Sequence, residues 1–265
     1  MGQSDQKPDH PAPHAPHHEL RTAENSAVYL LAKLRSIKEK NPQLTLLDVG
    51  AGSGSISATL AKEIPDGQVT ATDLKEETLL RAKAVAEAAG VKNIEFQQAD
   101  VYKLPFADET FDITHCHQVL CHLKQPSDAL REMLRVTKPG GVVAAREGDY
   151  ETDCVWPQLP GLIKFHKLVS GMMAKGGSNI AGRELLSWAL KAGAVRDQLT
   201  LSYGTWWFET QDDKKVWGRS PLHTAEYDYH VSNSDYLSRR NDTDGSRRHD
   251  SERRSPTWID HGGRP

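Results

Sequence analysis

Three aspartates stand at or near the ends of short apolar segments, where the side chains of an α/β sheet meet ligands. Asp48 lies within the first segment, Asp73 ends the second, and Asp100 ends the third. If these segments are parallel strands, their carboxyl ends share one edge of the sheet. A carboxylate there can pair with an ammonium group or accept hydrogen bonds from ribose hydroxyls and an adenine amino group. The pattern predicts a pocket for a ligand with a cationic amino-acid end, a ribose and an adenine.

A glycine-rich turn follows the first of these aspartates and would let the backbone approach such a ligand. Gly50, Gly52 and Gly54 are spaced G-x-G-x-G, and glycine turns tightly and leaves no Cβ in the way. Dinucleotide-binding folds prefer G-x-G-x-x-G, which would place the third glycine where Ser55 stands. Asp73 follows Gly54 by 19 residues, a spacing that suits both nicotinamide and adenosyl cofactors. The first aspartate favours the adenosyl ligand, because a carboxylate beside the turn would repel a pyrophosphate.

Strands and helices alternate along the chain, which predicts a doubly wound α/β fold with a parallel sheet. Apolar runs predict strands at 44–50, 67–73, 93–100, 111–117 and 142–148. Helical periodicity predicts helices at 20–40, 56–64, 76–90, 126–137, 159–175 and 182–194. We expect Lys138-Pro139-Gly140-Gly141 to close the helix before the fifth strand. Less regular patterns predict further strands at 195–203 and around Trp206–Phe208.

Four segments at this spacing resemble the motifs of class I S-adenosylmethionine-dependent methyltransferases. They are LLDVGAGSGSISATLA, VTATDL, ADVYKLPFADETFDITHCHQVLCHL and ALREMLRVTKPGGVV. Within that class the sequence is most similar to the group related to ubiquinone and menaquinone biosynthesis methyltransferases (UbiE-like), and residues 18–31 resemble that group's first helix. The resemblance covers residues 18–218. It implies a Rossmann-like fold with a mostly parallel, seven-stranded sheet and flanking helices.

The resemblance also implies a role for each matching residue, with S-adenosyl-L-methionine as the cofactor. These residues are Asp48, Gly50, Gly52 and Gly54 for the methionine part; Asp73 for the ribose; Leu74, Asp100 and Val101 for the adenine; and His117, Gln118 and Tyr29 around the methyl group. Tyr29 would close the pocket, with its ring facing the sulfonium.

Methyl transfer from a sulfonium is a direct displacement, so the protein mainly aligns the acceptor and excludes water. A base is needed only if the acceptor is a hydroxyl or an acidic carbon. His117, Glu147 and Asp149 lie near strand ends and are the predicted catalytic residues, with His122 as a further candidate base. Arg146, Glu147 and Asp149 are expected to contact the acceptor at the end of the fifth strand, and a surface ion pair is the alternative for them. A small hydrophobic or aromatic molecule is the expected acceptor.

The run from His115 to His122 contains histidines and cysteines, but it predicts no metal site. His115 and His117 alternate along a predicted strand, and the matching family positions line a cofactor pocket. Cys116, Cys121 and Cys154 are an odd number without framework spacing. They indicate reduced thiols in a cytoplasmic protein.

Composition limits the partners and divides the chain. The net charge of −3 argues against nucleic acid, and no apolar run approaches the length of a membrane span. Residues 1–18 predict a disordered tail, and 19–218 predict the methyltransferase domain. Residues 219–265 carry mixed charge without an apolar period, which predicts a disordered and atypical C-terminal tail. The expected partner is a small-molecule acceptor, and the oligomeric state stays open.

Three other functions fit parts of the pattern. The atypical tail favours a protein that binds S-adenosylmethionine without catalysis, as a pseudoenzyme or regulatory partner. A short-chain nicotinamide-dependent reductase needs Tyr-x-x-x-Lys after the fourth or fifth strand, whereas Tyr29 and Lys33 precede the first. Methylation of protein or nucleic acid is a further variant. An Asn-Pro-Pro-Tyr-like motif is missing where His117-Gln118-Val119-Leu120 stands.

Overall fold

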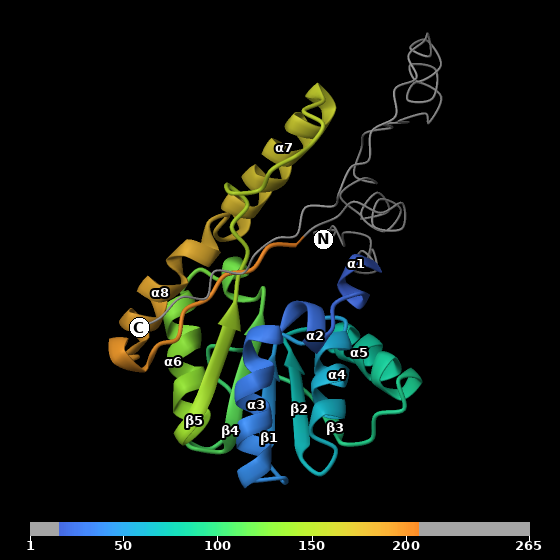
Figure 1. The fold of residues 1–265 in the computed structure, drawn as a ribbon, viewed down its shortest axis with the longest axis vertical. Helices are drawn as coiled ribbons and strands as arrows, with labels where there is room; N and C mark the ends of the chain where they lie inside the picture. Colours follow the sequence, from blue (N-terminus) through green and yellow to red (C-terminus); the bar gives the residue numbers. More distant parts are fainter. Residues whose placement is uncertain (1–15, 207–265) are drawn as a thin grey trace, which may run out of the picture. The chain divides into compact units, whose positions relative to one another are not determined.

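The computed structural model describes residues 16–206 of the chain. Its sheet has five parallel strands: β1 (Thr45–Val49), β2 (Gln68–Asp73), β3 (Ile94–Gln98), β4 (Phe111–His117) and β5 (Thr137–Arg146). Their order across the sheet is β3-β2-β1-β4-β5 (Figure 1). The chain builds outward from β1 to β3 and then crosses to the other side of β1. The carboxyl ends of β1 and β4 therefore flank a topological switch point, where such sheets bind ligands.

Helices cover both faces of this sheet, as predicted for a doubly wound fold. They are α1 (Pro16–Glu19), α2 (Ala23–Ser26), α3 (Val28–Lys40), α4 (Ser55–Glu63), α5 (Glu76–Ala88), α6 (Pro126–Val136), α7 (Pro160–Gly176) and α8 (Ala181–Ala192), with 3-10 turns η1 (Leu120–His122) and η2 (Arg196–Gln198). Leu46 belongs to a core with α2, α3 and α4, whereas its neighbour Leu47 belongs to a second core with α6 and α8. This alternation along β1 gives the sheet two buried faces.

The predicted helix over 20–40 is divided in two at Ala27. Thr22 caps α2 through a reciprocal pair of hydrogen bonds with Asn25. The Asn25 N–H donates to Thr22 Oγ1 at 3.3 Å, and the Thr22 N–H donates to Asn25 Oδ1 at 2.8 Å. Two orphan amides are satisfied in this way, so α2 begins firmly although it has a single turn. The cap fixes the path of the chain that precedes α2.

The start of β5 also differs from the prediction. The sequence predicts a closing turn at residues 138–141, but β5 already begins at Thr137. The pairing with β4 shifts register between Phe111 and Ile113, and Gly140 has φ +76°. The glycine absorbs this irregularity because it adopts positive φ without strain. Beyond it, β5 pairs regularly with β4 up to Arg146.

The described residues contain five strands rather than the expected seven. The strand predicted at 195–203 was wrong, because Arg196–Gln198 forms η2 and residues 199–206 have no regular structure. Leu201 is 58% exposed and Tyr203 is 99% exposed, so the segment has no buried face against which a strand could pack. Most of the strand predicted around Trp206–Phe208 and most of both predicted tails fall outside the described range.

Candidate active site

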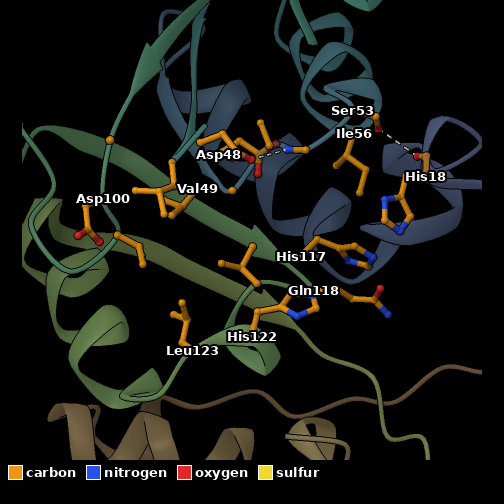
Figure 2. Close-up of a pocket in the computed structure, with 18 of the residues that line it drawn as sticks. His18, Asp48, Val49, Ser53, Ile56, Asp100, His117, Gln118, His122 and Leu123 are labelled. Atoms are coloured by element: carbon orange, nitrogen blue, oxygen red, sulfur yellow. Dashed lines mark hydrogen bonds between the residues drawn. The ribbon is translucent and has the colours of Figure 1, made fainter. Parts of the chain in front are cut away.

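A pocket of about 380 Å³ opens at the carboxyl ends of β1, β2 and β4 (Figure 2). This volume lies within the range of small-molecule sites. The lining residues come from the segment before α2, the glycine turn and the loops after β2, β3 and β4: His18, Arg21, Asp48, Val49, Gly50, Ala51, Gly52, Ser53, Ile56, Asp73, Leu74, Ala99, Asp100, Val101, Tyr102, His117, Gln118, Val119, His122 and Leu123. Most of the residues predicted to hold the cofactor therefore lie around one cavity.

The glycines of the turn have two roles: some line the pocket, and one allows two helices to pack closely. Gly50 and Gly52 line the pocket with φ of +71° and +55°. Gly54, also predicted to hold the cofactor, does not line it and has φ +77° at the N-terminus of α4. A Cβ on Gly54 would stand 2.6 Å from the Cβ of Ala82 on α5. Gly54 thus allows α4 and α5 to pack closely, and the first two glycines form the floor of the pocket.

The acids at the end of β2 and after β3 are hydrogen-bonded to nearby backbone N–H groups. Asp73 accepts the N–H of Gly52 at 3.1 Å through one oxygen and the N–H of Lys75 at 3.2 Å through the other. Asp100 accepts the N–H of Tyr102 at 2.9 Å. Each bond fixes a carboxylate at the rim of the pocket. Leu74, beside Asp73, is 63% exposed and lies at the mouth of the pocket.

A buried chain of polar side chains lies behind the pocket and ends at Asp48. Asp48 Oδ1 contacts His115 Nδ1 at 2.8 Å, and the Ser57 hydroxyl donates to Asp48 Oδ2 at 2.5 Å. His115 Nε2 lies 2.9 Å from the hydroxyl of Tyr29. Both ring nitrogens of His115 thus have a hydrogen-bond partner, Asp48 at Nδ1 and the Tyr29 hydroxyl at Nε2. The carboxylate of Asp48 is therefore held in one orientation.

This chain gives Tyr29 a different place from the one expected. It does not line the pocket, and its hydroxyl is engaged with His115. Burial, followed by the nearby Cys116 and Asp48, raises the pKa of Tyr29 well above its ordinary value. Tyr29 contacts the rear of the site and reaches the pocket only through His115 and Asp48.

His117, at the end of β4, presents buried ring nitrogens without a hydrogen-bond partner among the described residues. Its ring lies 5.8 Å from that of Trp206, measured between centroids. Burial, with His115, Arg21 and Arg146 nearby, lowers the pKa of His117 to about 2. A neutral imidazole keeps one donor and one acceptor nitrogen, and His117 lines the pocket. It is therefore ready to hydrogen-bond a bound molecule.

The other two predicted catalytic residues have protein partners and do not line the pocket. One Glu147 oxygen accepts the N–H groups of Val119 and Leu120 at 3.1 and 2.8 Å, and the other accepts that of Cys121 at 3.3 Å. Burial raises the pKa of Glu147 to about 7, against the effect of these amides. Asp149 forms two hydrogen bonds with the Arg183 guanidinium, at 2.5 and 2.8 Å. This ion pair is the alternative that the sequence had left open for Asp149.

The segment before α2 brings residues that the prediction missed. The carbonyl oxygen of His18 accepts hydrogen bonds from the hydroxyls of Ser53 and Ser55, at 3.1 and 3.0 Å (Figure 2 shows His18 beside Ser53). Arg21 follows and lines the pocket with its guanidinium 5.0 Å from the Trp206 ring centroid. The available signal was the resemblance of residues 18–31 to a family helix, which pointed to Tyr29 alone.

Two classes of feature are not found within residues 16–206. No group of three or more His, Cys, Asp or Glu side chains there is arranged to hold a metal ion. No helix in the same range is long and apolar enough to cross a membrane.

Comparison with known proteins identifies the class. Residues 47–145 match the family of the methyltransferase domain. The chain is 35% identical over 208 residues to an uncharacterized methyltransferase of Schizosaccharomyces pombe, covering 75% of this chain and 71% of that protein. It is 38% identical over 141 residues to the ubiquinone/menaquinone biosynthesis C-methyltransferase UbiE of Roseobacter denitrificans, covering 52% and 53%. A solved SAM-dependent methyltransferase of Aquifex aeolicus superposes with a TM-score of 0.41 at 24% identity, covering 61% of this chain and 87% of that one.

The chain belongs to the methyltransferase family. It is a class I enzyme that depends on S-adenosylmethionine. This assignment excludes the alternative that the chain is a nicotinamide-dependent reductase. Among UbiE enzymes the match spans about half of the relative's length, as in Roseobacter denitrificans.

The pocket suits the cofactor that this family implies. Gly50 and Gly52 leave the floor free of Cβ atoms, and acids stand on β1, β2 and after β3. Asp48, Val49 and Asp100 line the same pocket (Figure 2). A carboxylate near an ammonium group and another near ribose hydroxyls are favourable pairings. The chemistry of this donor set fits S-adenosylmethionine.

Proposed function

We propose that this enzyme transfers the methyl group of S-adenosylmethionine to a small hydrophobic or aromatic molecule by direct displacement. The observation that carries the proposal is the placement of Asp48, Asp73 and Asp100 around one cavity with a glycine floor. We place the enzyme in the UbiE-like group. The relatives named for ubiquinone and menaquinone biosynthesis, with 38% identity in Roseobacter denitrificans, support that placement.

In this proposal the cofactor lies along the carboxyl ends of β1, β2 and β3. Asp48 and the turn at Gly50 and Gly52 hold its amino-acid end, and Asp73 binds the ribose. Asp73 already accepts the N–H of Gly52, so the ribose hydroxyls would join or replace a bond that holds the loop. Leu74, Asp100 and Val101 surround the adenine. Gly54 and Tyr29 act on the site indirectly, through α5 packing and through His115.

S-adenosylmethionine supplies a methyl group that is already activated by the sulfonium, so the protein's residues need only position the acceptor and exclude water. His117 faces the pocket and is neutral, and a group with a pKa of about 2 is a weak base. We therefore assign His117 a hydrogen bond to the acceptor rather than proton removal. Glu147 positions Val119 under the pocket through its backbone bond. Asp149 fixes the segment after β5 through Arg183.

A calorimetric titration with S-adenosylmethionine tests the cofactor assignment. We expect saturable binding in the wild type and binding weakened by about 10- to 100-fold in Asp73→Asn, since a charge-assisted hydrogen bond contributes roughly 1.5–3 kcal/mol. The asparagine keeps an oxygen for the Gly52 N–H and removes the charge. Asp66→Asn is the matched control, because Asp66 is exposed and outside the pocket lining. A folded wild-type protein that binds NADPH and not S-adenosylmethionine would contradict the assignment.

A second assay tests the transfer itself. The protein is incubated with S-adenosylmethionine and a panel of hydroquinones, catechols and aromatic acids. Mass spectrometry then detects acceptors that have gained one methylene unit. We expect at least one product that disappears in Asp73→Asn and persists in Asp66→Asn.

A further inference from the structure

The pocket is lined by acidic side chains on one side and by histidines and an arginine on the other. Its acids belong to β1, β2 and the loop after β3, on one side of the switch point. Its other side is lined by histidines and an arginine, namely His18, Arg21, His117 and His122. Figure 2 shows Asp100 at one end of the cavity and His117 and Gln118 at the other. The cofactor accounts for the acidic side, which leaves the basic side for another molecule.

Arg21 contributes a permanent positive charge to this basic side, and within residues 16–206 it forms no ion pair with a carboxylate. Its guanidinium contacts the ring of Trp206, and no acidic side chain within residues 16–206 lies at ion-pair distance from it. Burial lowers the pKa of Arg21 to about 10, so it is still protonated at neutral pH. A half-buried guanidinium without an anion is costly unless a ligand supplies one.

A second cation approaches the same aromatic ring. The Arg146 guanidinium, from the end of β5, lies 4.8 Å from the Trp206 centroid, and its Nη1 donates to the carbonyl of Ser26 at 3.2 Å. Arg146 is therefore tied to the backbone, whereas Arg21 lines the cavity. The two positive charges repel each other, and each adds to the positive potential near His117.

The surroundings of Arg21 place it on the β4–β5 side. After burial, the largest effects on the pKa of Arg21 come from the charges of Tyr150, Cys121, Arg146 and Glu147. Cys121 lies in η1, Arg146 ends β5, and the other two follow β5. Its charge also lowers the pKa of His117 and His122. The Arg21 guanidinium thus lies on the side of the pocket where Arg146, at the end of β5, also approaches the Trp206 ring.

We propose that the methyl acceptor carries a carboxylate, which binds the Arg21 guanidinium while His117 contacts the same molecule. This rests on the proposed function, because it assigns the acidic side of the pocket to the cofactor. A guanidinium matches a carboxylate with two parallel hydrogen bonds. An aromatic acid would place its carboxylate at Arg21 and its ring near Trp206 and His117, whose rings are 5.8 Å apart.

The first experiment compares acids with their neutral amides. The full chain, with and without S-adenosylhomocysteine, is titrated with benzoate and salicylate and with benzamide and salicylamide. We expect each acid to bind about 10- to 100-fold more tightly than its amide, the range of a charge-assisted pair. Arg21→Gln removes this preference, Arg21→Lys retains part of it, and Arg81→Gln leaves it unchanged because Arg81 is exposed and outside the pocket. Equal binding of acids and amides, no binding by either, or a preference that survives Arg21→Gln overturns the proposal.

Thermal unfolding separates ligand binding from a structural role. Arg21 has no ion pair to lose among the described residues, so Arg21→Gln should unfold at the wild-type temperature or above it in the absence of ligand. Benzoate should then raise the unfolding temperature of the wild type and of Arg81→Gln, but not that of Arg21→Gln. A marked loss of stability in both Arg21→Gln and Arg21→Lys without ligand would show a structural role and overturn the proposal.

A second arm separates the acceptor from the cofactor, whose amino-acid end also has a carboxylate. Affinity is measured for S-adenosylhomocysteine and for 5′-methylthioadenosine, which lacks that end. We expect Arg21→Gln to change both affinities by less than about threefold. A selective loss of S-adenosylhomocysteine binding would assign Arg21 to the cofactor and overturn the proposal.

The outcomes distinguish this inference from the proposed function. A protein that binds S-adenosylhomocysteine but shows no acid preference keeps the function and loses the inference. A protein that shows an Arg21-dependent acid preference but binds no adenosyl ligand loses the function and keeps the carboxylate site.

Discussion

Three of the glycines with positive φ, Gly52, Gly54 and Gly90, allow a direct test of how the turn after β1 works. An alanine at any of them is strained, at a cost of about 1–2 kcal/mol for the left-handed region. A methyl group at Gly90 would enter open space, whereas a Cβ at Gly54 would meet the Cβ, Cα and carbonyl oxygen of Ala82 at 2.6, 2.7 and 2.9 Å. Two of those atoms are backbone, so the clash cannot be relieved by a rotamer change.

The magnitudes follow from these surroundings. Gly90→Ala should lower the free energy of unfolding by about 1 kcal/mol, through backbone strain alone. Gly54→Ala should lower it by about 3 kcal/mol or more, because overpacking adds roughly 1–3 kcal/mol. Gly52→Ala should resemble Gly90→Ala in stability, since the nearest atom to its Cβ is the Gly50 carbonyl oxygen at 4.0 Å. It should nevertheless lose at least about tenfold in S-adenosylhomocysteine affinity, because its methyl group enters the pocket floor.

Urea unfolding and calorimetry together provide the readout. Equal destabilisation by Gly54→Ala and Gly90→Ala would refute the packing argument for Gly54. Unchanged cofactor affinity in Gly52→Ala would refute the assignment of the pocket floor. Either result would mean that the roles of Gly52 and Gly54 have to be reassigned.

Two further predictions concern the buried polar groups. Tyr29→Phe leaves His115 Nε2 without its partner in a fully buried ring and should cost about 1–3 kcal/mol in urea unfolding, whereas Tyr102→Phe, at a 38% exposed side chain, should cost less than about 1 kcal/mol. A similar loss in both variants would contradict the network. The pKa of Glu147 is raised from 4.5 to about 7 in the folded protein. Between these two pH values Glu147 is protonated in the folded state and ionised in the unfolded chain. The free energy of unfolding should therefore fall by about 3 kcal/mol between roughly pH 4.5 and 7, relative to Glu147→Gln, at about 1.4 kcal/mol per pKa unit. If the wild type and Glu147→Gln lose stability in parallel over this pH range, Glu147 is already ionised near pH 4.5 and the prediction is wrong.

The regular part of the fold could be predicted because each element carries its own local signal. Leu46 and Leu47 alternate between the two cores of the sheet, and Leu30, Leu31 and Leu34 form the buried stripe of α3. The strand-end rule likewise led to Asp48 and Asp73, which line one pocket. The strand predicted at 195–203 failed because apolar residues there find no surface to cover.

The partners of the remaining site residues depend on tertiary packing and left no local trace. Glu147 could be placed near the strand ends, but its three amide contacts arise only when residues 119–121 fold beneath it. Arg21 looks like an ordinary charged residue before a helix, and it enters the pocket because the His18 carbonyl binds the serine hydroxyls of the glycine turn. Such contacts join segments more than 25 residues apart, beyond any short sequence window.

The strand order also has a consequence for how this enzyme can change. The acids that we assign to the cofactor fall within residues 48–100, one uninterrupted stretch of chain. The basic side of the pocket instead combines the segment before α2 with the end of β4 and η1. If our assignment is right, substitutions in those two separate segments alter acceptor preference without touching the acids that bind the methyl donor. A designer seeking new substrates would randomise Arg21, His122 and Trp206 and leave the stretch from Asp48 to Asp100 intact. In the proposed arrangement, the cofactor site and the surface that sets the substrate range therefore lie on different parts of the chain.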